Sequence, residues 1–169
     1  MFKIEGKKGL KKASKLVLDV CCGSKMFWFD KNDPRAIFGD IREETHTLCD
    51  GRALEIKPDI KFDFRNLPFS DNIFKLVVFD PPHLRSCGTT SWIGKKYGIL
   101  SKDWKEDLTL GFSQCFRVLE PNGVLIFKWN EDQIKVSEIL KLTDQKPLFG
   151  HRSGKASKTH WISFIKEAL

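Results

Sequence analysis

The sequence lacks several features that would assign a protein to a class at once. Its apolar runs are well short of the roughly 20 residues that a membrane-spanning helix needs, and its lysine-rich start contains no apolar segment of the kind found in secretory signals. These absences predict a cytoplasmic protein with no membrane partner. The five cysteines form no CxxC pair, so neither a disulfide framework nor a metal site is predicted. His46 and Cys49 have the spacing of two metal ligands, but no second pair accompanies them.

Two common phosphate-binding motifs are also missing. The chain contains neither the dinucleotide fingerprint GxGxxG nor the P-loop pattern GxxxxGK[ST]. It therefore has no glycine loop for a pyrophosphate. If the protein binds a nucleotide-like ligand, a nucleoside without phosphates is the better fit.

What the sequence does contain is enough apolar material for one folded domain. It has 169 residues, of which 41% are hydrophobic and 12% aromatic, and this predicts a single domain over residues 1–169. Lys and Arg outnumber Asp and Glu by 29 to 22, giving a net charge of +7. That surplus favours polyanionic partners such as nucleic acid, with a lysine-rich solvated surface as the simpler alternative. Residues 1–14 form a basic N-terminal segment.

Short apolar runs alternate with helical patterns along the chain. The candidate strands are residues 15–24, 36–40, 60–64, 74–80, 123–130 and 160–166. Apolar residues at helical spacing predict helices over 102–119 and 132–142, and the Gly, Ser and Lys of 150–158 predict a loop. Such alternation is typical of an open, mainly parallel α/β sheet whose ligands bind beyond the carboxyl ends of the strands. The first four strands each end at or near an aspartate, so we expect these acids to meet at that edge.

Two of these aspartates have the spacing of a nucleoside site. Asp19 lies four residues before Gly23, in a turn of small residues that is expected to lead into a helix N-terminus. Asp40 lies 21 residues after Asp19, which suits a carboxylate that accepts both ribose hydroxyls. The alternative for each acid is a helix N-cap or an ordinary loop carboxylate.

Over nearly its whole length the sequence resembles the class I S-adenosylmethionine-dependent methyltransferases. "VLDVCCG" is similar to their first motif, usually written D-x-G-x-G, and "DFRNLPFSDNIFKLVVFD" is similar to their segment from the third to the fourth strand. The resemblance implies a Rossmann-like, mainly parallel sheet of about seven strands, with an antiparallel last strand and helices on both faces. It also implies S-adenosylmethionine as the cofactor.

The cofactor site that the resemblance implies consists of Asp19, Cys21, Cys22, Gly23, Asp40, Asp63 and Phe64. The methionine end would lie at Asp19 and the backbone near Gly23. The ribose would lie at Asp40, and Asp63 would receive the adenine amino group. Cys21 stands where the family pattern has its first glycine. The adjacent cysteines could indicate redox chemistry, but small side chains beside a nucleoside pocket are the simpler interpretation.

The stretch "DPPH" follows the fourth strand and is suited to accepting hydrogen bonds. Two prolines fix the backbone and remove two donors, which leaves the carbonyl groups of Asp80 and Pro81 free as acceptors. A ring-bound amino group is a poor nucleophile, and accepting its hydrogens would aim the nitrogen lone pair at a sulfonium methyl group. The stretch resembles the [DN]-P-P-[YFWH] signature of amino-group methyltransferases, most closely the adenine-N6 type. The catalytic residues implied are Asp80, Pro81, Pro82 and His83, with His83 stacking on the base; the alternative is turn chemistry alone.

The candidates for substrate binding are Leu84, Trp92, Lys95, Lys96, Tyr97, Lys128 and Asn130. Most of them lie in residues 85–102, a long segment expected to form an active-site loop or lid. Its aromatic and basic residues could stack on bases and hold phosphates. Alternatively, the aromatic residues pack over the cofactor.

Taken together, these patterns predict a methyltransferase for an exocyclic amino group of a nucleobase in DNA or RNA, with adenine N6 favoured. The sequence resembles small methyltransferases of phages and prophages. No target-recognition domain is visible, so the target would be read by loops or with the help of a protein partner. The alternatives are a methyltransferase for a protein glutamine or a small amine, and a non-catalytic cofactor-binding module of the same fold.

Overall fold

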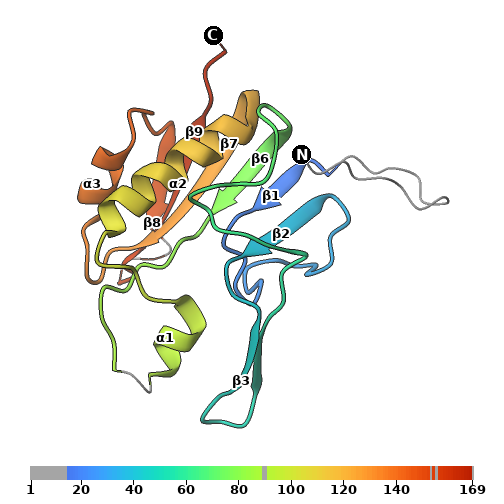
Figure 1. Ribbon diagram of the computed structural model, residues 1–169. Coiled ribbons are helices and arrows are strands. Elements are labelled where there is room, and N and C mark those ends of the chain that lie inside the picture. Colours follow the sequence, from blue (N-terminus) through green and yellow to red (C-terminus); the bar gives the residue numbers. More distant parts are fainter. Residues whose placement is uncertain (1–14, 89–90, 153, 155, 169) are drawn as a thin grey trace, which may run out of the picture.

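A seven-stranded sheet forms the centre of the computed structural model, which describes residues 15–88, 91–152, 154 and 156–168 (Figure 1). The strands are β1 (Val17–Asp19), β2 (Ala36–Asp40), β5 (Ile60–Lys61), β6 (Phe74–Phe79), β7 (Leu119–Asn130), β8 (Phe149–Arg152) and β9 (Thr159–Ile165). Their order is β5-β2-β1-β6-β7-β9-β8. The first five are parallel, and β9 is antiparallel to both β7 and β8. The predicted sheet of about seven strands with an antiparallel last strand is therefore confirmed.

The main core lies between this sheet and the helix α2 (Trp104–Val118). The apolar face predicted for this segment is buried, and Phe112 packs against Phe79 and Phe127 with ring centroids 5.4 and 4.9 Å apart. The short helices α3 (Val136–Ile139) and η1 (Leu140–Leu142) extend the same core (Figure 1). Together they replace the single helix expected over 132–142.

The opposite face of the sheet is covered differently. The helix expected after Gly23 does not form; residues 20–35 run as turns and bends, so among the described residues the helices that pack on the sheet lie on one face. Two side chains show why: Asp30 and Asp33 each accept a hydrogen bond from the backbone N–H two residues later, which favours turns over a helix. Trp28 from this loop packs edge-on against Phe38 at 4.7 Å and forms a small second core.

Four elements were not predicted from the sequence. The strands β3 (Glu44–Thr47) and β4 (Ala53–Ile56) form an antiparallel hairpin that projects away from the sheet. The helix α1 (Trp92–Tyr97) lies within the predicted loop 85–102, near the same end of the sheet as the hairpin (Figure 1). The strand β8 occupies the start of the predicted loop 150–158. The basic segment 1–14 lies outside the described residues, and no described helix has the length and apolar character to cross a membrane.

Candidate active site

A cavity lies beyond the carboxyl ends of β1, β2 and β6, where the sequence predicted a ligand site. Its lining residues are Val20, Cys21, Cys22, Gly23, Ser24, Met26, Phe27, Asp40, Ile41, Arg42, Phe64, Asp80, Pro81, Pro82, His83, Lys96 and Tyr97. Gly23 has a φ of 48° and open space where a side chain would begin. A ligand can therefore approach the backbone of this turn closely.

Asp40 ends β2 and lines this cavity. Its Oδ2 atom accepts a hydrogen bond from the Gly23 N–H at 2.9 Å, and its Oδ1 atom accepts one from the Arg42 N–H at 2.9 Å. Each carboxylate oxygen has two acceptor positions; Oδ1 also accepts a hydrogen bond from Arg42 Nε at 3.4 Å, so Oδ2 is the oxygen that keeps a free position for a ligand hydroxyl group. Arg42 also contacts this carboxylate and donates from Nη1 to the Lys95 carbonyl at 2.9 Å, which ties α1 to the site.

Asp19 is fully buried and does not line the cavity. Its Oδ2 atom accepts a hydrogen bond from Trp28 Nε1 at 2.8 Å, and its Oδ1 atom accepts one from the Cys21 N–H at 3.3 Å. Burial raises the pKa of this carboxyl to about 7; the Trp28 hydrogen bond opposes the rise and the charge of Asp80 adds to it. In this structure Asp19 therefore positions the loop 20–28 beneath the cavity.

The two cysteines at the turn are small lining residues. Cys22 is buried and Cys21 is half-buried, and desolvation raises the pKa of both thiols well above the usual value. Both side chains are therefore neutral thiols at physiological pH. This state favours the packing interpretation over redox chemistry.

Asp63 and Phe64, which were both predicted for the cofactor site, lie in different environments. Phe64 lines the cavity and packs edge-on against Phe79 at 5.4 Å. Asp63 does not line it, and its carboxylate forms an ion pair with Arg65 at 2.5 Å. The structure thus brings Phe64, but not Asp63, to the cavity with Asp40.

A second cavity, of about 330 Å³, adjoins the first. It is lined by Met26, Phe27, Asp80, His83, Tyr97, Lys128, Asn130 and Thr159. Five of these residues, including Asp80, also line the first cavity. Asp80 therefore faces both cavities, one at the ends of β1 and β2 and the other at the ends of β7 and β9.

Asp80 is paired with Lys128 across the two neighbouring strand ends. Lys128 Nζ lies 2.5 Å from Asp80 Oδ2, and the side chains are 16% and 18% exposed, respectively. Burial raises the pKa of the Asp80 carboxyl, and the charge of Lys128 opposes this rise. Asp80 Oδ1 accepts no hydrogen bond from the residues that the structure describes. One oxygen of the carboxylate is thus available to a ligand.

His83 lies beside Asp80 with its ring near two aromatic side chains. Its centroid is 5.2 Å from that of Tyr97 and 6.3 Å from that of Trp129. Burial, followed by the charge of Lys128, lowers the pKa of His83 to about 4. The imidazole is therefore neutral at physiological pH and presents a flat, uncharged surface to the cavities.

The remaining candidates are only partly brought together. Lys96 and Tyr97 line the first cavity, and the Lys96 ammonium lies 5.0 Å from the Tyr97 ring. Leu84 is buried, while Trp92 is 45% exposed. Leu84, Trp92 and Lys95 line neither of the two cavities. Of the lid predicted over residues 85–102, the residues that line these cavities are Lys96 and Tyr97, at the end of α1.

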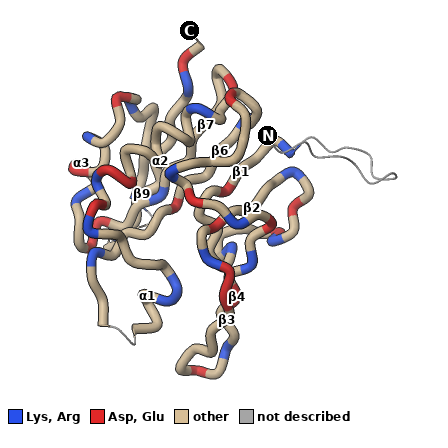
Figure 2. The backbone as a smooth tube through the Cα atoms, viewed as in Figure 1, with Lys and Arg blue, Asp and Glu red and all other residues tan. Residues whose placement is uncertain are grey.

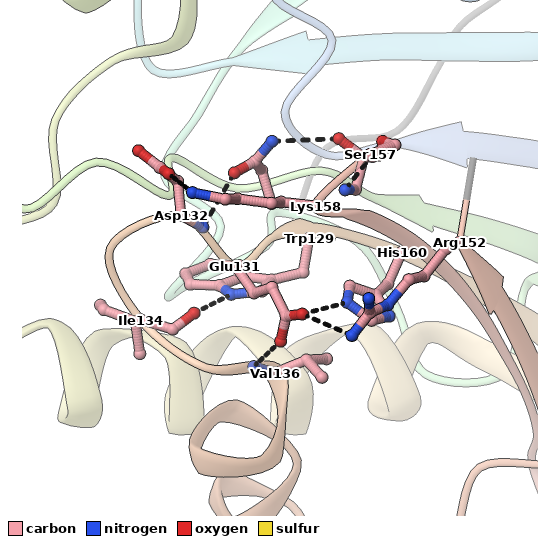
Figure 3. A network of polar contacts seen from close by, with 11 residues as sticks. Trp129, Glu131, Asp132, Ile134, Val136, Arg152, Ser157, Lys158 and His160 are labelled. Atoms are coloured by element: carbon pink, nitrogen blue, oxygen red, sulfur yellow. Dashed lines mark hydrogen bonds and ion pairs between the residues drawn. The ribbon is translucent and has the colours of Figure 1, made fainter. Parts of the chain in front are cut away.

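The ends of β7 and β9 are held together by a polar network around the buried Glu131 (Figure 3). Its Oε1 atom lies 3.1 Å from His160 Nε2 and 3.0 Å from Arg152 Nη2, so the carboxylate joins β7 to both strands of the β8–β9 pair. Asn130, one residue earlier, donates to Thr159 Oγ1 at 3.1 Å. This network fixes the strand ends that carry the polar side of the second cavity.

Several lining residues were missed from the sequence. Met26 and Phe27 come from the loop after β1, Arg42 follows β2, and Thr159 begins β9. None of them belongs to a motif with recognisable spacing. Phe27 lines the second cavity together with Asp80 because the loop after β1, which was expected to be helical, brings it there.

The fold is similar to that of several solved structures, although no protein-family model and no curated protein sequence matches the chain. A TehB-like SAM-dependent methyltransferase from Corynebacterium glutamicum aligns with a TM-score of 0.57 at 15% identity, over 91% of this chain and 81% of that one. The PH0226 protein from Pyrococcus horikoshii aligns with a TM-score of 0.55 at 18% identity, over 90% and 82%. The N-methyltransferase NodS from Bradyrhizobium japonicum aligns with a TM-score of 0.54 at 11% identity, over 90% and 85%. The chain therefore has the Rossmann-like fold found in SAM-dependent methyltransferases.

Proposed function

We propose that the protein is an S-adenosylmethionine-dependent methyltransferase acting on an exocyclic amino group of a nucleobase in nucleic acid, with adenine N6 favoured. The observation that carries this proposal is the position of Asp80, which faces two adjoining cavities and has one carboxylate oxygen that accepts no hydrogen bond from the described residues. A transfer reaction needs two binding sites that meet at the reacting atoms. The fold agrees with methyl transfer, and the "DPPH" stretch agrees with nitrogen as the acceptor atom.

The residues around the first cavity fit the cofactor. Asp40 can accept ribose hydroxyls, the turn at Cys22 and Gly23 exposes its backbone to the methionine portion, and Phe64 offers an apolar wall to the adenine. Bound there, S-adenosylmethionine would supply an electrophilic methyl group. An adenine contact from Asp63 would require its carboxylate to turn away from Arg65.

Asp80 would orient and activate the amine in the second cavity. Its Oδ1 atom, which accepts no hydrogen bond from the described residues, would accept one N–H of the amino group and favour a pyramidal nitrogen whose lone pair is available for methylation. Transfer of the methyl group that the cofactor would supply would leave positive charge on the nitrogen, beside this carboxylate. The proton that the nitrogen then loses can pass to Asp80, whose pKa is raised by burial.

The walls of the second cavity suit a planar base. The neutral His83 ring and Tyr97 provide flat surfaces, and Lys96 places positive charge beside them. The two lysines of α1, Lys95 and Lys96, lie in its last turn, the blue stretch of this helix in Figure 2. We propose that they contact the phosphate backbone of the nucleic acid, with loops or a protein partner supplying the target specificity.

A labelling experiment tests the proposal. The pure protein is incubated with methyl-labelled S-adenosylmethionine and separate pools of DNA, RNA and cell protein, and the labelled pool is digested to identify the methylated unit. Recovery of N6-methyladenine, or of another base methylated on its amino group, would support the proposal. Label confined to protein or to small amines would overturn the nucleobase assignment, and absence of transfer to every pool would overturn the enzyme assignment.

A further inference from the structure

The Asp80–Lys128 pair is placed by the register of two strands. Phe79 of β6 lies opposite Phe127 of β7 in a parallel ladder, so Asp80, the residue after β6, lies beside Lys128 of β7. Their ion pair is therefore built into the same strand ends that form the second cavity. It joins the carboxylate proposed to hold the amine to a cation on the next strand.

Lys128 is held in this position by aromatic rings from two other segments. Its ammonium lies 5.3 Å from the Phe27 ring and 5.6 Å from the Trp161 ring, and these two rings pack edge-on at 5.3 Å. Cation–π contacts at such distances hold a lysine side chain without using its N–H donors. An ammonium has three donors, and within the described part of the chain only Asp80 accepts from this one. The others are available inside the cavity that Lys128 lines.

We infer that Lys128 is a specificity-determining residue that reads the acceptor atom next to the target amine. This inference rests on the proposed function. Asp80 offers an acceptor and Lys128 offers a donor beside it. An amino group whose carbon also bonds a ring nitrogen or a carbonyl oxygen presents the complementary donor and acceptor. Adenine presents this pair at N6 and N1, and cytosine presents it at N4 and N3. The substrate class is therefore an amine with a neighbouring acceptor atom.

The same pair disfavours a simple alkyl amine. Such an amine is protonated at physiological pH, and its charge would lie close to the Lys128 ammonium in a half-enclosed site, where like charges repel. It would also leave the donors of Lys128 without a partner. A neutral aminopurine or aminopyrimidine meets neither penalty.

Deaza analogues separate this role from a purely structural one. Single-stranded oligonucleotides carry adenine, 1-deazaadenine or 7-deazaadenine at every adenine position, with the sugar backbone matched to the pool that is labelled above. The unmodified protein should methylate 1-deazaadenine at least about tenfold more slowly than 7-deazaadenine, because only the first analogue lacks the N1 acceptor. For Lys128→Met, which keeps the apolar stem, methylation of adenine should fall and the difference between the two analogues should disappear. Lys128→Gln, which restores an N–H donor, should recover part of that difference.

Each outcome has a distinct meaning. If the unmodified protein methylates both analogues equally, or if Lys128→Met slows both by the same factor, Lys128 does not read the acceptor and the inference is wrong. Thermal melting of each variant identifies a loss that comes from unfolding, and the ratio between the analogues is unaffected by the fraction of folded protein. If the 7-deaza oligonucleotide and normal adenine both remain unmethylated by the unmodified protein, the adenine-N6 part of the proposed function is wrong, and the inference that Lys128 reads adenine N1 falls with it.

Discussion

The backbone N–H of Gly23 donates a 2.9 Å hydrogen bond to the carboxylate of Asp40, which joins the turn after β1 to the end of β2. The side chain proposed to bind the ribose therefore also shapes the turn proposed to bind the methionine portion of the cofactor. Asp40 is only 4% exposed, and the loss of its carboxylate would remove the hydrogen-bond partner of the Gly23 N–H. Binding and local stability are coupled through this one residue.

Asp40→Ala should therefore weaken cofactor binding and lower stability together. We expect a loss of about 1–3 kcal/mol in the free energy of unfolding from the unpaired Gly23 N–H, and at least a tenfold weaker affinity for S-adenosylhomocysteine. Calorimetric titration and thermal melting measure the two effects. Asp59→Ala is the matched control, because Asp59 accepts a hydrogen bond from the Phe38 N–H of the same strand at 3.2 Å but lies outside the cavity. Unchanged affinity in Asp40→Ala would contradict the ribose assignment.

Gly39 provides a test of the packing beneath the site. A methyl group at this position would lie 1.9 Å from the Phe62 ring, so the ring would have to move within a filled core. Gly39→Ala should therefore lower the free energy of unfolding by about 1–3 kcal/mol. Gly88→Ala, where the added methyl group meets open space, should be close to neutral. Denaturant unfolding of both variants compares them, and equal stability would show that the β2–Phe62 contact is looser than described.

The fold could be predicted from the sequence wherever one pattern determined the structure. β2 forms over the predicted residues 36–40, and α2 (Trp104–Val118) falls within the predicted 102–119, because buried apolar runs and helical spacing are strong local signals. The helix expected after Gly23 was wrong, since turn-forming aspartates between β1 and β2 outweighed the family pattern. The hairpin β3–β4 was missed because its strands have only four residues each, and only Leu54 and Ile56 among them are buried.

The site shows a similar division. The positions of Asp40 and Asp80 follow from parallel strands that end at one edge, and both acids line the first cavity as the pattern indicated. The ion pair of Asp63 with Arg65 and the aromatic contacts of Lys128 depend on side-chain conformation and on loops far apart in sequence. No spacing in the sequence encodes such contacts. Lys128 could be named as a site residue, but its role depends on the structure.

Asp19 should make stability depend on pH in a defined direction. Burial raises the pKa of this carboxyl from 3.8 to about 7, so the folded state binds more protons than the unfolded state between these values. The contribution of Asp19 to the free energy of unfolding should therefore fall as the pH rises from about 4 to about 7, by an amount on the order of a few kcal/mol.

The comparison variant is Asp19→Asn, which cannot ionise but keeps an oxygen that can accept the Trp28 N–H. The melting temperature of the unmodified protein should fall relative to that of Asp19→Asn as the pH rises from about 5 to about 8. Taking the difference between the two proteins removes the titration of other groups. A difference that does not change with pH would mean that the Asp19 carboxyl titrates near its usual value.

Nucleic-acid binding, if it follows the proposal, should weaken steeply with salt. Lysines that neutralise phosphates release counterions, so the logarithm of affinity falls linearly with the logarithm of salt concentration. Lys95→Gln combined with Lys96→Gln in α1 should reduce the slope by about two. Lys75→Gln, an exposed change in β6 away from the strand ends that form the site, should leave the slope unchanged. Fluorescence anisotropy with a labelled oligonucleotide measures the slopes, and binding that is insensitive to salt would favour a protein or small-amine substrate.

Asp80→Ala should separate catalysis from cofactor binding. The carboxylate is proposed to hold the amine through Oδ1 and to contact the cofactor little, so methyl transfer should fall on the order of 100-fold or more while affinity for S-adenosylhomocysteine is nearly unchanged. Asp80→Asn should keep part of the activity, because its amide oxygen still accepts one hydrogen bond and asparagine occurs at this position in the motif that "DPPH" resembles.

Asp132→Ala is the matched control, since this nearby acid pairs with Lys158 and lines neither cavity. Removing Asp80 leaves the Lys128 ammonium unpaired, so each variant is also tested for thermal stability and assayed at saturating cofactor. Transfer by a folded Asp80→Ala protein at close to the unmodified rate would show that the two prolines and their aspartate only shape a turn, and the amino-group assignment would then be wrong.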